Sequence, residues 1–153
     1  MRYLELPTKE GGYFRTGSRT PMQWSRGTNL GFSSASPDKL YLPVDPASDA
    51  PTVSEQEADS DSLLSFVKRL IQLRHTYKEL QADGDFKVIC SEPGRPFVFQ
   101  RGQLTIAVNT TSKSSSLHIS LPDCHLLFAE GNGGYDPVAK LLTLNPQSFL
   151  ILG

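Results

Sequence analysis

The sequence predicts a mainly β protein, in which an antiparallel β-sandwich or barrel follows one long amphipathic helix and an extended loop. Three observations predict this order. Residues 1–59 hold six of the eleven prolines and show no hydrophobic repeat. Apolar residues then recur with helical spacing over 60–80, and after Gly84 they alternate in short runs.

The first 59 residues predict an ordered loop that packs on a surface. A disordered segment would contain few aromatic side chains, whereas this one contains six. If nothing covers the loop, Trp24 and Phe32 should form an exposed apolar patch through which the chain self-associates. The aromatic residues are Tyr3, Tyr13, Phe14, Trp24, Phe32 and Tyr41.

The segment from about 60 to 80 predicts a helix that buries one face against a neighbour. Asp59, Ser60 and Asp61 are expected to cap its N-terminus, where the helix dipole favours negative charge. The apolar stripe has i, i+3, i+4 and i+7 spacing. It consists of Leu63, Phe66, Val67, Leu70, Ile71, Leu73, Tyr77 and Leu80.

After Gly84 the sequence predicts seven short strands about ten residues apart, a pattern typical of an antiparallel sandwich or barrel. Turn residues separate them. Among these, 131–134 (Gly-Asn-Gly-Gly) is predicted to be a hairpin turn rather than a phosphate cradle. The expected strands are 86–89, 97–99, 104–108, 117–121, 126–128, 141–144 and 149–152.

Composition excludes several classes of function. The formal net charge of −1 excludes the clustered basic surface that nucleic-acid binding requires. No apolar run approaches the roughly 20 residues that span a membrane, and the absence of an apolar leader predicts a cytoplasmic location. Cys90 and Cys124 lie in alternating apolar stretches and are expected to be small, partly buried hydrophobes without a disulfide.

The residues alone show no catalytic constellation. The acids Glu55, Glu57, Asp59 and Asp61 favour a solvated, helix-capping cluster over a catalytic or metal site. No Gly-x-Ser-x-Gly nucleophile elbow occurs, and the three histidines lack metal-ligand spacing. We therefore expect no metal and no cofactor.

One loop segment, residues 15–24, is unusual because two arginines four residues apart precede a Pro and a Gln-Trp pair. Trp24 and Gln23 are expected to be structural, with the tryptophan buried and the glutamine bonded to backbone groups. For Arg15 and Arg19 two interpretations remain open: a structural role, or contact with a ligand, because guanidinium groups suit bidentate oxygen partners.

This segment resembles a known family. Residues 15–24 resemble the Arg-Asp-Gly-x-Arg-Thr-Pro-Met-Gln-Trp segment of the α-glucosidase and oligo-1,6-glucosidase branch of the α-amylase superfamily, glycoside hydrolase family 13. Thr16 departs from the pattern, since the family has Asp there. The resemblance continues over 29–33 (Asn-Leu-Gly-Phe-Ser), 40–45 (Leu-Tyr-Leu-Pro-Val-Asp), 53–56, 61–64 and 70–74.

The resemblance implies that residues 1–81 are the last βα loop and final helix of a (β/α)8 barrel. Residues 82–153 would be the family's C-terminal antiparallel sandwich, of Greek-key type. It also implies that Arg15, and Arg19 with it, bind the glucosyl group of an α-linked gluco-oligosaccharide. The family's catalytic carboxylates lie upstream of this segment, so the chain is expected to be a C-terminal fragment, inactive alone, that supports the missing barrel.

Two alternatives remain open. The parent enzyme could be a glucosyl transferase or a trehalose- or sucrose-isomerising relative, because donor and acceptor selectivity lies mostly in loops outside this segment. Alternatively, the sandwich could be a non-enzymatic carbohydrate-binding or interaction module, which would require a row of exposed aromatic side chains on one face.

Overall fold

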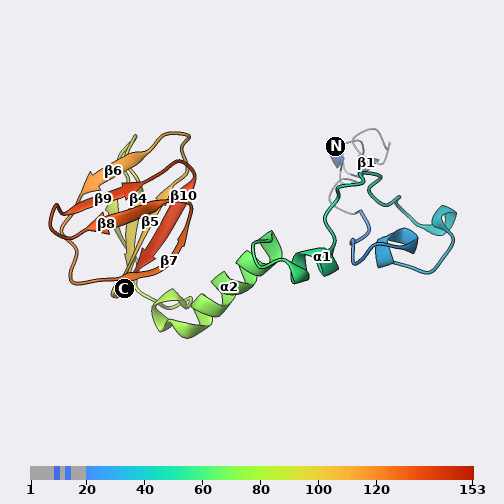
Figure 1. Cartoon of the computed structure of the whole chain (residues 1–153), viewed down its shortest axis with the longest axis horizontal. Coiled ribbons are helices and arrows are strands. Elements are labelled where there is room, and N and C mark those ends of the chain that lie inside the picture. The colour runs from blue at the N-terminus through green and yellow to red at the C-terminus, as the bar shows by residue number, and fades with distance from the viewer. Residues whose placement is uncertain (1–8, 11–12, 15–19) are drawn as a thin grey trace. The chain divides into compact units, whose positions relative to one another are not determined.

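The computed structural model describes residues 9–10, 13–14 and 20–153. The chain divides into two compact units, 1–72 and 73–153, and each is described by itself. Most of the regular structure is antiparallel sheet, with few helices, so the mainly β class predicted from the sequence is confirmed. Figure 1 shows the elements in chain order.

The N-terminal unit is largely irregular, as its prolines predict. It contains a two-residue antiparallel pair, β1 (Lys9–Glu10) and β2 (Tyr13–Phe14), and two 3-10 turns, η3 (Thr28–Gly31) and η4 (Pro37–Lys39). Between 20 and 52 the chain has no strand.

The buried side chain of Asn29 holds the turn at η3. Its Nδ2 donates to the carbonyl oxygens of Ser33 at 2.9 Å and Ala35 at 2.8 Å. Asn29 has a φ of 50°, and Gly31 has a φ of 73°, so both positions lie in the left-handed region. A Cβ at Gly31 would also meet Ser25 Oγ at 2.7 Å. The turn therefore requires the Asn and the Gly of the motif over 29–33.

The helix predicted over about 60–80 is α2 (Leu63–Thr76), followed by the 3-10 turn η5 (Lys78–Leu80). A short helix that was not predicted, α1 (Val53–Ala58), precedes α2. Tyr77 adopts an extended conformation and separates α2 from η5.

The predicted helix cap is corrected. Ser62, not Asp59, Ser60 or Asp61, supplies the side-chain oxygen at the start of α2, because the amide of Ser65 donates to Ser62 Oγ at 3.2 Å. The side chain of Asp59 instead accepts from the amide of Asp61, before the helix begins.

The apolar stripe is covered in part, and Phe66 and Leu70 are half-buried. Leu73, Tyr77 and Leu80 pack against the sheet residues Leu104 and Ile106. By contrast, Leu63, Val67 and Ile71 are exposed, and Leu63 keeps 71% of its surface accessible. The helix therefore buries only part of the face that the sequence predicts.

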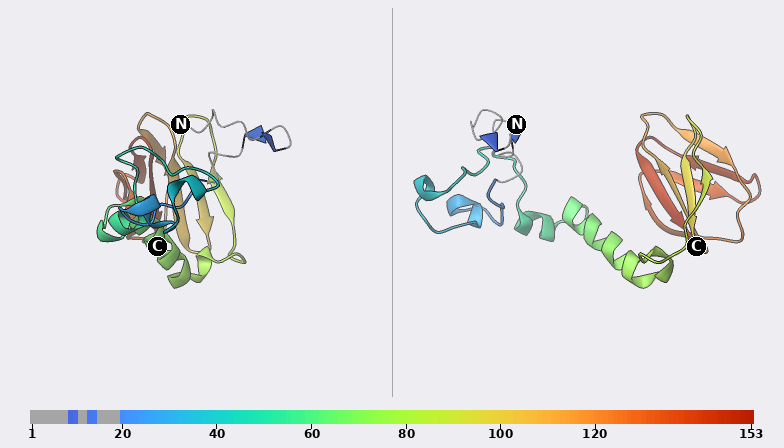
Figure 2. Two further views of the ribbon diagram at one scale, coloured as in Figure 1. Left: turned by 90° about the vertical axis from the view of Figure 1, so that its right-hand side faces the viewer. Right: turned by 180° about the vertical axis from the view of Figure 1, so that it is seen from behind.

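The C-terminal unit contains two antiparallel sheets, seen from two further sides in Figure 2. Neighbouring strands are antiparallel throughout, and β10 lies between β5 and β7. The five-stranded sheet, in spatial order, is β3 (Lys87–Cys90), β4 (Phe97–Arg101), β5 (Leu104–Asn109), β10 (Ser148–Leu152) and β7 (Leu126–Glu130). The three-stranded sheet is β6 (Ser115–His118), β9 (Leu141–Leu144) and β8 (Gly133–Asp136).

The two sheets share one apolar core. Val98, Ala107 and Leu150 from the five-stranded sheet pack with Leu142 and Leu144 from the three-stranded sheet, and all five are fully buried. The partly buried hydrophobes packed against this core include Cys124, and Cys90 lies within it. Both thiols are free, as the sequence predicts.

The glycine-rich segment 131–134 is not a hairpin turn. Gly133 and Gly134 begin strand β8, which pairs with β9, whereas the preceding strand β7 pairs with β10 in the other sheet. The segment therefore crosses between sheets. Gly133 suits this position, because a Cβ there would lie 2.8 Å from the carbonyl oxygen of Thr143 on β9.

Candidate functional site

The two arginines predicted to contact substrate, Arg15 and Arg19, lie outside the described residues, as does the departing Thr16. The structure describes the end of their loop, from Thr20 onward. It shows which hydrogen bonds hold the segment that follows the arginines.

Trp24 and Gln23 differ from their predicted structural roles. Trp24 is 50% exposed, so it is not a buried anchor. The side-chain oxygen Oε1 of Gln23 is buried and has no hydrogen-bond partner among the described residues.

Backbone hydrogen bonds hold these two positions against α1. The amide of Val53 donates to the carbonyl oxygen of Gln23 at 2.9 Å, and the amide of Ser54 donates to that of Trp24 at 3.0 Å. Both donors lie in the first turn of α1, where amides have no partner within the helix. The carbonyl oxygens of the loop therefore accept hydrogen bonds from the first-turn amides of α1, and the same bonds fix the path of the loop.

An ion pair joins the same two segments through side chains. Arg26 Nε donates to Glu55 Oε1 at 2.8 Å, and Arg26 Nη2 donates to Glu55 Oε2 at 3.0 Å, a bidentate arrangement. Glu55 Oε2 also accepts from the buried hydroxyl of Thr52 at 2.8 Å, and the two residues form a capping box. These hydrogen bonds, the one from Arg26 first, hold the pKa of the Glu55 carboxyl below its ordinary value.

Sequence reasoning missed this pair. A Thr followed three residues later by Glu is the signal of a capping box, and it could have located the start of α1. Nothing in the sequence relates Arg26 to an acid 29 positions away.

Two aromatic side chains line a groove on the same unit. Phe32 and Tyr41, both exposed, line a groove of about 230 Å³ together with Thr20, Pro21 and Leu42. Trp24 and Phe32 are exposed, as predicted for a loop that nothing covers.

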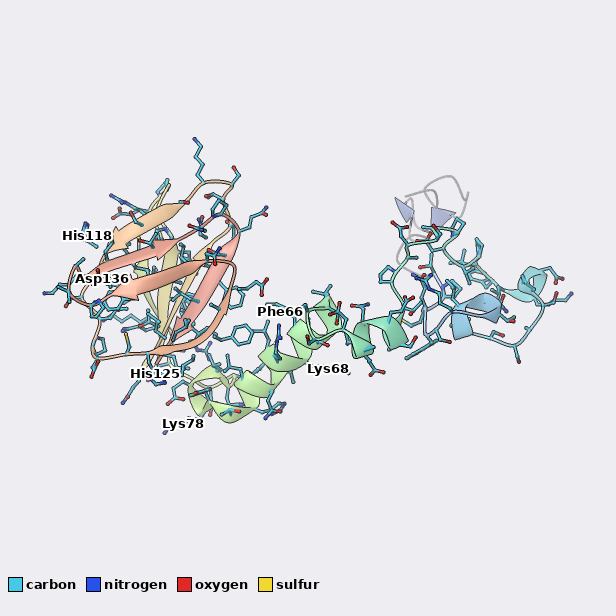
Figure 3. The ribbon with its side chains drawn as sticks, in the orientation of Figure 1. Phe66, Lys68, Lys78, His118, His125 and Asp136 are labelled. Atoms are coloured by element: carbon cyan, nitrogen blue, oxygen red, sulfur yellow. The ribbon has the colours of Figure 1, made fainter. Side chains whose placement is uncertain are left out.

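The acidic residues Glu55, Glu57 and Asp59 each have a hydrogen-bond partner in the chain. Glu57 accepts from Lys68 Nζ at 3.0 Å, and Lys68 projects from α2 (Figure 3). His118 and His125 lie in the C-terminal unit (Figure 3). Among the described residues, no three His, Cys, Asp or Glu side chains gather closely enough to hold a metal ion.

Asn109, the first residue of an Asn-x-Thr glycosylation motif, is a structural residue. It is buried, and its Nδ2 donates to the carbonyl oxygens of Lys113 and Asn145, each at 2.8 Å. Its Oδ1 accepts from the hydroxyl of Thr111 at 2.8 Å. The side-chain amide nitrogen of Asn109 is therefore hydrogen-bonded inside the fold.

Comparison with known proteins identifies the family. Residues 6–83, half of the chain, match the family model described as α-amylase, catalytic domain. The chain belongs to the α-amylase family. This confirms the resemblance that the motifs of residues 15–74 predict.

Individual relatives place the chain near the α-glucosidases of this family. It is 37% identical over 106 residues to the probable oligo-1,6-glucosidase 2 of Bacillus subtilis, a match covering 67% of the chain and 18% of the relative. It is 31% identical over 124 residues to the α-glucosidase MAL12 of Saccharomyces cerevisiae, covering 77% of the chain and 21% of the relative.

A solved structure has a similar fold. The trehalulose synthase MutB of Pseudomonas mesoacidophila MX-45 matches 91% of the chain and 26% of its own length, with 26% identity and a TM-score of 0.71. The chain thus spans about a fifth of the length of the curated relatives it matches. In the part of the chain that the structure describes, no helix is long and apolar enough to cross a membrane.

Proposed function

We propose that this chain is the C-terminal part of an α-glucosidase-like glycoside hydrolase that acts on the α-glucosidic bonds of oligosaccharides. Residues 1–81 would form the last βα loop and final helix of its (β/α)8 barrel, and residues 82–153 its C-terminal sandwich of Greek-key type. The match of residues 6–83 to the α-amylase catalytic domain carries the proposal.

In this proposal Arg15 and Arg19 contact the glucosyl group, and the catalytic carboxylates come from the preceding part of the barrel. Active sites of such barrels lie at the loops that follow the strands, which fits arginines in a strand-to-helix loop. The chain then contributes binding and support, and chemistry requires the rest of the barrel.

The uncovered apolar surface supports this arrangement. Leu63, Val67 and Ile71 form an exposed row along α2, and Trp24 and Phe32 are exposed on the preceding loop. Exposed apolar rows of this kind mark surfaces that a partner covers. We assign both to contact with the missing barrel, and without it we expect the chain to self-associate.

The first test is turnover. The purified chain should release no glucose from maltose, isomaltose or aryl α-glucosides. Turnover that scales with the amount of this chain over several purifications would contradict the proposal.

The second test is complementation. The B. subtilis relative, shortened by the segment that this chain matches, should regain glucose release from isomaltose when the chain is added. Val67→Asp should abolish the gain, because it places a charge on the exposed row. Val138→Asp is the matched control, because Val138 is also exposed but lies in the other unit. Failure of the unmodified chain to restore any activity would contradict the supporting role.

A glucosyl transferase or isomerase is the nearest alternative, and the likeness to a trehalulose synthase favours it. Hydrolysis and transfer differ only in whether water or a sugar hydroxyl takes the glucosyl group. Product analysis of the whole parent protein with trehalose or sucrose separates them, since isomeric disaccharides form only by transfer.

A carbohydrate-binding module is the second alternative. Phe86, directly before β3, and Phe97 on β4 are exposed, and each ring centre lies about 5 Å from that of Phe99. Calorimetric titration with starch oligosaccharides tests it: saturable binding that Phe86→Ala removes would favour the module.

A further inference from the structure

A polar groove in the C-terminal unit is lined by η5, the segment that follows it and the turn between β4 and β5. We call it the η5 groove; Lys78 marks the position of η5 in Figure 3. Its volume is about 400 Å³, within the range of small-molecule sites. Gly84 and Gly102 form part of its wall, and the side chains that line it are Lys78, Glu79, Gln81, Asp83, Asp85 and Gln103.

Hydrogen bonds from β4 hold the backbone of the η5 groove in place. Arg101 Nε donates to the carbonyl oxygen of Glu79 at 3.1 Å, and Arg101 Nη2 donates to that of Gln81. The amide of Gly84 donates to the same carbonyl oxygen of Gln81 at 3.1 Å. A Cβ at Gly102 would lie 2.7 Å from Glu79 Cγ, so only glycine permits this approach of the turn to η5. The wall is thus formed before a ligand arrives, which lowers the cost of binding.

The side chains at the mouth of the η5 groove are available to a ligand. Lys78, Asp83, Asp85 and Gln103 are exposed, and none of them makes a hydrogen bond or ion pair with another side chain or backbone group in the part of the chain that the structure describes. Gln81 differs, because its Nε2 donates to the carbonyl oxygen of Arg74. The groove therefore combines a fixed wall with unpaired polar groups.

The chemistry of the lining restricts the class of ligand. Three carboxylates against one ammonium group make the lining net negative, so it repels anions. No three His, Cys, Asp or Glu side chains among the described residues gather closely enough to hold a metal ion. The lining offers both acceptors and donors, because carboxylates accept, the Lys78 ammonium donates and the Gln103 amide does both. Hydroxyl groups also donate and accept, whereas an organic ammonium ion could only donate.

We propose that the η5 groove binds a neutral polyhydroxylated ligand, namely a gluco-oligosaccharide. Hydroxyl groups on adjacent carbons of a sugar ring donate to Asp83 and Asp85 and accept from Lys78 and Gln103. The choice of glucose rests on the proposed function, in which the parent enzyme acts on such oligosaccharides. Binding in the groove itself does not depend on Arg15 or Arg19.

The first test is a titration of the whole chain with isomaltotriose, followed by its backbone amide NMR signals. Saturable shifts should centre on residues 78–85 and 101–103, the two segments that form the groove. The absence of saturable shifts in these segments would overturn the proposal. Shifts there with calcium chloride but none with isomaltotriose would also overturn it, because the groove would then be a cation site.

The second test repeats the titration with variants of the lining. Asp83→Ala and Asp85→Ala should each weaken the affinity roughly tenfold, and Gln103→Ala about threefold, because hydrogen bonds to charged groups are the stronger ones. The matched control is Asp123→Ala, since Asp123 is an exposed aspartate of the same unit outside the groove. It should leave the affinity unchanged.

Two patterns of affinity would contradict the η5 groove as the binding site. The first is an equal affinity in the lining variants and in the Asp123→Ala control. The second is binding that Phe86→Ala removes while the lining variants keep it, which would locate the ligand on the aromatic face of the sheet.

The proposed function can fail independently of this inference. Saturable binding in the η5 groove together with failed complementation would contradict the proposed function alone. Successful complementation by a chain that shows no binding in the groove would contradict the saccharide site alone.

Discussion

Replacing Leu150 with alanine tests whether the two sheets share one core. Leu150 is 0% exposed on the interior strand β10, opposite Ala107 and Ala129 on its two neighbours. Two small neighbours leave little that can move into the space, so most of the cavity should persist.

The size of the effect follows from the atoms removed. Leucine to alanine deletes three carbons, and at about 0.8 kcal/mol each the lost transfer free energy is about 2.4 kcal/mol. A persistent cavity adds about 1 kcal/mol, so the free energy of unfolding should fall by about 3.5 kcal/mol. For a unit of this size, whose whole stability is about 4–12 kcal/mol, that is a large fraction.

Urea denaturation followed by far-ultraviolet circular dichroism measures this loss. With a slope of about 1.5 kcal/mol per molar, the midpoint should fall by about 2 M. Leu126→Ala is the matched control, because Leu126 belongs to the same sheet but is 54% exposed. Its midpoint should change little, and equal shifts in the two variants would refute the assignment of Leu150 to a closed core.

Three further predictions concern single groups. Gly133→Ala should destabilise the C-terminal unit by about 1–3 kcal/mol in urea, because its methyl would crowd the backbone of β9. Gly134→Ala, which meets nothing within 4 Å, should change the midpoint far less, and equal effects would contradict the close approach. Glu55 should titrate below the ordinary glutamate range in a carboxyl NMR titration, and removal of its guanidinium partner should raise that pKa. Because the folded pKa is the lower one, its stabilising contribution is present above the unfolded pKa and is lost as the pH falls through the folded value. An unchanged titration without the guanidinium would refute this. Burial, with a smaller contribution from a neighbouring aspartate, raises the pKa of the Cys124 thiol, so iodoacetamide should label it slowly at neutral pH, and the buried Cys90 only after unfolding. Rapid labelling of Cys90 in the folded chain, detected by mass spectrometry, would contradict its place in the core.

The strands were predictable from the sequence where alternation is strong. The segments over 97–99, 104–108 and 149–152 became β4, β5 and β10 with shifts of at most two residues at either end. The side chains of each strand alternate between the shared core and the opposite face of the sheet. A hydrophobic alternation with a period of two is therefore enough to predict these strands.

Two elements were missed for different physical reasons. Strand β8 begins with Gly133 and Gly134, which resemble a turn in sequence but allow close approach to β9. Helix α1 has six residues, too few for a helical period to emerge. Its capping box was the available signal.

The candidate site was predictable only as a motif. Residues 15–24 identify the family, and the exposure of Trp24 follows from a loop that nothing covers. The contact joins Arg26, in a turn, to Glu55, 29 residues further along the chain in α1, and local patterns do not encode it.

The position of β10 sets the order in which this unit can be assembled during synthesis. β10 is the last strand along the chain, yet it supplies hydrogen-bond partners to both β5 and β7. Until residues 148–152 have left the ribosome, β5 lacks one neighbour and β7 has no partner in its sheet. The nascent unit therefore exposes open strand edges for the whole of its translation, a state in which chaperone binding would protect it from aggregation.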